Sequence, residues 1–264
     1  MKKRIFMIAL LSAITMLPTC KKSEQELVVT VQFSVGNAKI VSASGVKAAS
    51  SGAVISYDDS IVTGPSSVVD LNFGTKGVIR IVENSSVKMA VLQAHTGNEQ
   101  VQFDMKKGKI FVIMSKLSKE SSFRVTTPTT IAAIRGTSFM VVSDPKNSRI
   151  YVLKGRVLVQ LAKEGKLAEN IEKMLEANKK VIVSEDLVNQ IIAGKKEIEV
   201  VPLSPKEISE IKKEIKNIKV SDKLDPEAQK ELTEITQDSA VKPDTTKNKK
   251  QETQNKDIQP MPSL

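Results

Sequence analysis

The 264-residue chain contains no tryptophan, one cysteine and one histidine. Aromatic residues make up only 3% of it, which argues against the stacking platforms that hold single-stranded nucleic acids. One cysteine cannot form an intramolecular disulfide, and one cysteine with one histidine cannot supply the ligands of a nitrogen and sulfur zinc site. The net charge is +10, but the lysines are spread among glutamates rather than gathered in one motif. We therefore expect no nucleic-acid partner.

The motifs that mark most catalytic centres are missing as well. His95 lies in a predicted turn, and no nucleophile-elbow motif accompanies it. Asp58 and Asp59 are adjacent, but they lack the regular spacing of a calcium-binding loop. No phosphate loop of the form GxxxxGKS/T occurs. The sequence thus predicts a protein that is not an enzyme and that has no catalytic, metal-binding or cofactor-binding residues.

The chain has one long apolar run, residues 5–17, which follows the basic stretch MKKR. A membrane-spanning helix needs about 20 apolar residues, so this run is too short to span a bilayer comfortably. Its length and basic flank are typical of a secretory signal peptide. We therefore predict a signal peptide over residues 1–19.

The single cysteine follows this run in the sequence LPTC. Leu17, the small residue Thr19 and Cys20 resemble the lipobox of bacterial lipoproteins, and Pro18 resembles the looser lipoboxes of spirochaetes. The resemblance implies that Cys20 carries fatty acyl chains such as palmitate and becomes the mature N-terminus. Several acyl chains give stable anchoring, at about 0.8 kcal/mol per buried CH₂. The alternative is an ordinary signal peptide with an incidental cysteine. Lipidation would place the protein in the cell envelope, on the inner or outer membrane, with residues 20–26 as tether.

Residues 27–161 contain many short runs of alternating apolar residues, separated by turn signals such as FGTKG and KKG. In SVVDLNF, for example, Val69, Leu71 and Phe73 lie on one side of a strand. In LVVTVQFSV the alternation places five apolar residues on one face: Leu27, Val29, Val31, Phe33 and Val35. This pattern predicts an antiparallel β-sandwich or β-roll.

Residues 162–236 form a mixed extension in which helices are expected. In residues 166–180, Leu167, Ile171, Met174 and Leu175 recur at helical spacing, so we predict a helix there. A short strand VIVS, a helix DLVNQIIAG closed by a glycine and a strand over residues 197–201 should follow.

Residues 204–218 begin with a capping signal, since Ser204 is followed by Pro205 and Glu207. Four isoleucines form a seam along this predicted helix: Ile208, Ile211, Ile215 and Ile218. We favour a helix lying on the β domain over a docking or coiled-coil helix. Residues 225–236 suggest a weak further helix. Residues 237–264 have too few apolar residues to fold and should be disordered.

The stretch FRVTTPTTIAAIRGTSF, residues 123–139, combines two strands with a proline and a glycine. Pro128 cannot donate to a ladder, so strand pairing should break there. Gly136 permits a bulge or a positive φ. Arg135 beside it would either find carboxylate or carbonyl partners or reach solvent. We expect a structural corner in which Arg135 has a structural role.

This stretch resembles the hallmark of the FecR-type domain, a V-x-T-P strand end followed by R-G-T-x-F. The matching residues are Val125, Thr127, Pro128, Arg135, Gly136, Thr137 and Phe139. Residues 58–73, 106–117 and 152–161 resemble neighbouring family segments, so the likeness covers about residues 38–161. It implies an all-β envelope domain. The best-known members relay transport signals to a sigma factor through a transmembrane helix and a cytoplasmic segment, neither of which this sequence predicts.

Together these features predict a membrane-anchored envelope lipoprotein with a FecR-like, non-catalytic binding, sensing or scaffold domain. Its partners would be the membrane, through Cys20, and a protein of the envelope. The alternative is a surface-exposed lipoprotein that binds host or cell-wall components.

Overall fold

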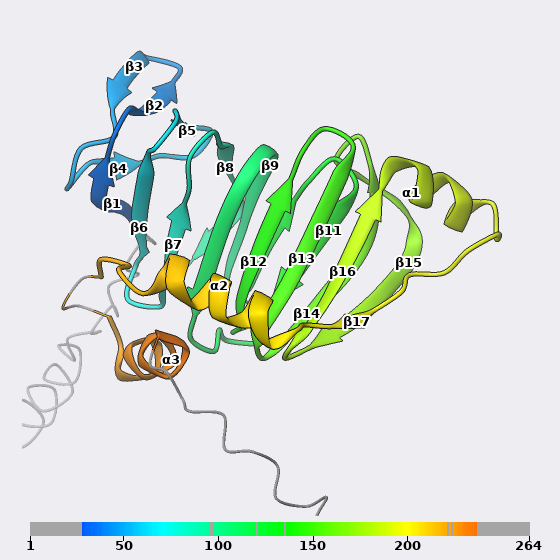
Figure 1. Cartoon of the computed structure of the whole chain (residues 1–264). Helices are drawn as coiled ribbons and strands as arrows, with labels where there is room; N and C mark the ends of the chain where they lie inside the picture. The colour runs from blue at the N-terminus through cyan, green and yellow to red at the C-terminus, as the bar shows by residue number, and fades with distance from the viewer. Residues whose placement is uncertain are drawn as a thin grey trace, which may run out of the picture.

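The structure is a computed structural model that describes residues 28–95, 98–119, 121–134, 136–220, 222 and 224–236, without the side chains of residues 91–99 and 169–170. The predicted signal peptide, Cys20, the tether, Arg135 and the tail 237–264 lie outside the described residues. The described chain is mainly β, as predicted, and forms two packed sheets that share one long strand, β9 (Asn98–Met114). Figure 1 shows the two layers and the helices beside them.

Sheet A contains the second half of β9 and eight other strands. Their order is β4 (Val54–Ile55), β1 (Val29–Val35), β6 (Val68–Phe73), β7 (Gly77–Ile81), β9, β12 (Ser138–Ser143), β13 (Asn147–Lys154), β16 (Lys179–Ser184) and β17 (Val201–Pro202). Sheet B contains the first half of β9. Its order is β3 (Gly45–Ala48), β2 (Ala38–Ser42), β5 (Ser60–Thr63), β8 (Ser86–His95), β9, β10 (Ser122–Thr126), β11 (Thr130–Ile134), β14 (Arg156–Lys163) and β15 (Lys166–Glu176). Among the described strands, the pairings are antiparallel except for β9 with β10, which is parallel.

The main core lies between the two sheets. Phe73 of sheet A meets Phe123 of sheet B edge to face with ring centroids 5.5 Å apart, and Phe103 lies 5.4 Å from Phe123. The predicted alternation of β6 is confirmed, since Val69, Leu71 and Phe73 are all buried. In β1 it holds only in part, because the register shifts after Val31 and leaves Val35 49% exposed.

Gly108 is the point at which β9 bends from sheet B into sheet A. The sequence KKG was expected to be a turn, but it lies inside this single 17-residue strand. Gly108 has a φ of +119°, and a Cβ there would lie 2.1 Å from the Oγ of Ser85. Only glycine fits both the conformation and the space, so the bend depends on it.

The predicted helix over residues 166–180 is wrong, because this segment forms the edge strand β15. Glu164 and Gly165 both have positive φ and make a two-residue hairpin turn that returns the chain along β14. Leu175 then enters the core opposite Val157, whereas Met174 is 48% exposed. Pairing with β14 thus overrides the helical spacing.

Strand β16 and helix α1 (Glu185–Ile192) follow as predicted, with Ser184 accepting a hydrogen bond from the N–H of Leu187 at the helix start. Val188 and Ile191 of α1 belong to the main core. The strand expected over residues 197–201 is reduced to the two residues of β17.

Helices α2 (Pro205–Ile215) and α3 (Pro226–Thr236) cover the outer face of sheet A (Figure 1). The capping box of Ser204 and Glu207 is present. Three isoleucines of the predicted seam, Ile211, Ile215 and Ile218, belong to a second cluster that includes Val78, Phe111 and Met140, whereas Ile208 is half-buried outside it. The prediction that this helix lies on the β domain is therefore confirmed. None of the helices in the described residues is long and apolar enough to cross a membrane.

Candidate functional site

The turn between β10 and β11 closes one end of the sandwich. Strand β10 ends at Thr126 and β11 begins at Thr130, so the ladder breaks around Pro128. The N–H of Thr127 donates to the carbonyl of Thr130 (2.8 Å), and the N–H of Thr130 donates to the Oγ1 of Thr127 (2.9 Å). The turn is thus fixed by its own threonines.

Buried hydroxyl groups connect this turn of sheet B to sheet A. The Oγ1 of Thr129 donates to the Oγ of Ser148 in β13 (2.7 Å) and lies 3.0 Å from the carbonyl of Val183 in β16. The Oγ of Ser148 donates in turn to the Oγ1 of Thr127 (2.7 Å). All three hydroxyl residues are at most 2% exposed. The threonines therefore hold the two sheets together rather than presenting reactive groups.

The segment after β11 crosses from sheet B to sheet A. Gly136 has a φ of +124°, and a Cβ there would lie 2.5 Å from the Cα of Lys116. Thr137 fixes the crossing, since its N–H donates to the carbonyl of Met114 (3.1 Å) and its Oγ1 donates to the carbonyl of Arg156 (2.9 Å). Phe139 then enters the core. The expected positive φ at Gly136 is confirmed, and Arg135 lies outside the described residues.

An open groove of about 830 Å³ lies beside this crossing. Its floor is a row of paired residues across sheet B, in which Ala133 of β11 pairs with Leu158 of β14, and Leu158 pairs with Met174 of β15. Arg124 of β10 pairs with Ala133 and extends the row. The groove is therefore apolar along its floor and bounded by a cation at one end.

Besides Lys154, three cationic side chains line the groove: Lys116, Arg124 and Arg156. Within the described residues, none of them forms a salt bridge with a carboxylate. Lys116 and Arg156 are exposed, and Arg124 is half-buried. We call the feature formed by these three cations and the apolar floor the basic groove.

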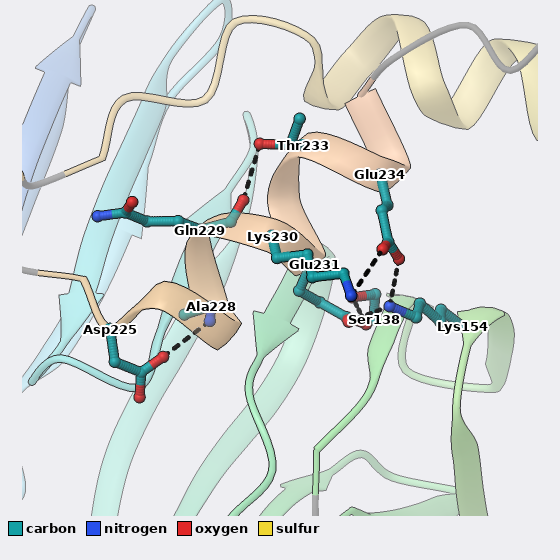
Figure 2. A network of polar contacts seen from close by, with 9 residues as sticks. All are labelled: Ser138, Lys154, Asp225, Ala228, Gln229, Lys230, Glu231, Thr233 and Glu234. Carbon is teal, nitrogen blue, oxygen red and sulfur yellow. Dashed lines mark hydrogen bonds and ion pairs between the residues drawn. The ribbon is translucent and has the colours of Figure 1, made fainter.

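Helix α3 forms the other side of the basic groove with Glu227 and Glu231. Glu231 is engaged, since it accepts hydrogen bonds from Lys154 and from the Oγ of Ser138 (3.1 Å) (Figure 2). Lys154 also bonds Glu234, at 2.6 Å. Burial acts to lower the pKa of Lys154, but the hydrogen bonds to Glu231 and Glu234 outweigh it and raise that pKa. Lys154 therefore secures α3 and is not available to a ligand, unlike the three cations of the groove.

Asp225 anchors the start of α3. Its carboxylate accepts a hydrogen bond from the N–H of Ala228 at 2.7 Å (Figure 2) and forms a 3.0 Å ion pair with Lys76. Burial acts to raise its pKa, but the Ala228 N–H and Lys76 lower it below the usual value. Asp225 thus stays ionised and caps the helix.

A buried ion pair anchors the end of α2. Arg80 of β7 donates from Nε and Nη2 to the two carboxylate oxygens of Asp70 in β6, at 2.7 and 2.8 Å. The guanidinium also donates to the carbonyls of Glu214 (2.7 Å) and Asn217 (2.9 Å), and the N–H of Lys219 donates to Asp70 (2.8 Å). This pair ties the last turn of α2 to the sheet.

The other residues considered for chemistry do not converge. His95 ends strand β8 rather than lying in a turn. Asp58 forms a 2.9 Å ion pair with Lys88, while Asp59 accepts the N–H of Ser56. In the part of the chain that the structure describes, no group of three or more His, Cys, Asp or Glu residues could hold a metal ion.

The comparisons with known proteins agree with the hallmark. Residues 59–158 match the family model described as FecR protein. The chain carries a FecR domain. The resemblance seen in the sequence is thereby confirmed over these residues, and the match supports a non-catalytic sensing or regulatory domain. Most of the basic groove lies inside the matched range.

Among solved structures, the chain resembles two crystal structures of a proposed anti-sigma factor from Parabacteroides distasonis. The identities are 15% and 17%, and the TM-scores are 0.43 and 0.42. In both cases the match covers 57% of this chain and 62% of the other. No curated protein matches the chain significantly.

Proposed function

We propose that the protein is a membrane-anchored envelope lipoprotein whose FecR domain binds another protein through the basic groove. The observation that carries the proposal is the groove itself, which lies beside the family hallmark and mostly within the residues that match the FecR family model. An apolar floor with cations at its rim that have no carboxylate partner among the described residues suits a segment that carries both apolar and acidic side chains.

The shape of the crossing supports this role. Gly136 and Gly155 both have positive φ, and a Cβ at Gly155 would lie 3.0 Å from the carbonyl of Gly136. The two glycines let the backbones beside the groove pack closely, so this side of the groove is built from tightly packed main chain. Such a pre-formed surface would order few side chains when it binds, which lowers the entropic cost of binding.

The anchoring part of the proposal rests on the LPTC sequence at Cys20. Labelling with a clickable palmitate analogue should mark the wild-type protein and not a Cys20→Ala variant. Equal labelling of the two would contradict lipidation at this residue.

The binding part is tested by crosslinking in the native envelope, followed by mass spectrometry of the adducts. In an Arg124→Glu/Arg156→Glu variant, the yield of the specific protein adduct should be at least tenfold lower than in the wild type. Arg149→Glu reverses the charge of an exposed arginine on sheet A outside the groove, and it should retain the adduct. Equal loss in both variants, or no specific protein adduct in the wild type, would refute groove binding.

The alternative of a surface-exposed lipoprotein gives a different result in protease shaving of intact cells. A protein facing the periplasm should survive shaving and be digested after lysis. Digestion in intact cells would favour the surface-exposed alternative.

A further inference from the structure

Exposed apolar side chains are concentrated at one side of the molecule. Among the described residues, eleven large apolar side chains are exposed, and seven of them fall within residues 28–62. These seven are Val28, Val35, Val41, Val46, Val54, Tyr57 and Val62. Figure 1 shows that the strands of this region, β1 to β4 in blue, gather at one side. Most of this region precedes the matched FecR range, which begins at residue 59.

Three of these valines form a continuous patch on the outer face of sheet B. Val46 of the edge strand β3 pairs with Val41 of β2, and Val62 of β5 pairs with Lys39, two residues from Val41. Their exposed fractions are 63% for Val46, 36% for Val41 and 37% for Val62. We call these three residues the valine patch. Side chains of this type exposed together on a sheet edge mark a contact surface.

The charges around the valine patch are cationic. Lys39 lies within the patch, whereas Lys47 lies on the opposite face of the edge strand β3, where it pairs with the core residue Ile40; both lysines are exposed. Within the described residues neither lysine forms a salt bridge, while the exposed Asp58 is already paired with Lys88. Exposed lysines near apolar side chains at a sheet edge complement a surface of anionic lipid headgroups.

The length of chain between Cys20 and the fold restricts which surface faces the membrane. Only eight residue steps separate Cys20 from Val28, and an extended chain spans at most about 3.6 Å per residue, or roughly 29 Å in all. Strand β1 begins directly after Val28 and lies on the same side as the valine patch (Figure 1). Acyl chains on Cys20 would therefore hold this side of the protein close to the bilayer.

We infer that the side formed by β1 to β5 rests on the lipid surface that anchors Cys20, with the valine patch in the headgroup layer and Lys39 and Lys47 on anionic lipids. This inference rests on the lipidation in the proposed function. In sheet B the patch lies on β3, β2 and β5, whereas the basic groove lies on β10, β11, β14 and β15 toward the opposite edge.

The test places a photo-crosslinking amino acid at Val46 or Val62 of the full-length protein in the membranes of the producing cells. Matched controls are Leu167 and Ile182, which are each 47% exposed but lie on β15 and β16, far along the sheets from the patch. Lipid adducts should be at least fivefold more abundant at the two patch positions. Equal lipid adducts at all four positions, or adducts at Val46 to a second copy or another protein, would overturn the inference.

A charge-reversal pair tests the lysines. Lys39→Glu/Lys47→Glu should lower the lipid adduct at Val62 at least threefold. Lys195→Glu/Lys196→Glu, an exposed pair just after α1, should leave it unchanged. An equal effect of both pairs would overturn the role given to Lys39 and Lys47.

Palmitate labelling in the same cells separates the two proposals. A labelled wild-type protein without lipid adducts at Val46 and Val62 would refute the membrane-facing side and leave the anchor intact. A wild-type protein that is neither labelled nor membrane-bound would refute both.

Discussion

Replacing Asp70 by asparagine should strongly destabilise the protein, because it leaves a buried guanidinium without its counter-ion. The side chains of Asp70 and Arg80 are only 0% and 8% exposed. Removing one member of such a buried pair costs about 3–5 kcal/mol of the free energy of unfolding. Asparagine keeps the size of the side chain, so the loss reports the charge and its hydrogen bonds rather than a cavity.

The measurement is urea unfolding of the purified protein followed by circular dichroism. Lys88→Ala breaks the exposed Asp58–Lys88 pair and should cost at most about 1 kcal/mol. The double variant Asp70→Leu/Arg80→Met should lose less than Asp70→Asn, because it leaves no unpaired charge. Trypsin should also cleave α2 faster at Lys212 and Lys213 in Asp70→Asn, since Arg80 holds the end of that helix. A loss below about 1 kcal/mol in Asp70→Asn, equal to that of Lys88→Ala, would refute the anchoring role.

Three further predictions concern the corner and the cap of α2. Gly136→Ala should lower the free energy of unfolding, measured in urea, by about 1–3 kcal/mol more than Gly45→Ala does. Both glycines have a φ near +125°, but only Gly136 has backbone atoms within 3 Å of the added Cβ. Equal losses in the two variants would contradict this reasoning. Thr129→Val should lower the free energy of unfolding by about 1–3 kcal/mol, because it removes the hydrogen-bond partner of the buried Ser148 hydroxyl and Val183 carbonyl. An unchanged free energy of unfolding would contradict the role given to this hydroxyl network. The hydrogen bond from Lys180 and those from Ser204 lower the pKa of Glu207 from 4.5 to about 2. The ionised Glu207 therefore contributes fully to the stability of the fold above pH 4.5, and this contribution is lost as the pH falls through about 2. The Tm of Glu207→Gln should therefore lie below that of the wild type at pH 7 and converge with it near pH 2; a constant difference would contradict this.

The sequence was sufficient where a local pattern decides the structure. The alternation in β6, the break around Pro128 and the capping box at Ser204 each depend on neighbouring residues, and each is present in the structure. The helix predicted over residues 166–180 failed because its apolar spacing also suits an edge strand. The Glu164–Gly165 turn and the pairing with β14 decided between the two, and only the fold shows that pairing.

The basic groove and the Asp70–Arg80 ion pair could not be predicted, because each depends on contacts between residues that are distant in the sequence. Lys116, Arg124 and Arg156 come from separate parts of the sequence and meet only through the crossing at Gly136. Asp70 stands on the opposite face of β6 from the predicted apolar row, where a charged residue suggests solvent exposure. It is buried because α2 covers that face of the sheet. A carboxylate within a mostly apolar strand was the one available signal, and it did not identify Arg80 as the partner.

The sharing of β9 between both sheets has a consequence for how the chain folds as it emerges, N-terminus first, into the compartment where it folds. Strand β9 pairs with β8 and β10 in sheet B and with β7 and β12 in sheet A, so it is central to both. While only residues before 98 have emerged, β1 to β8 can form hairpins, but neither sheet has its central strand. The apolar faces of those first strands must then wait uncovered, which makes this interval the one most prone to aggregation. A chaperone that binds the emerging chain should therefore be needed most until Met114 has emerged.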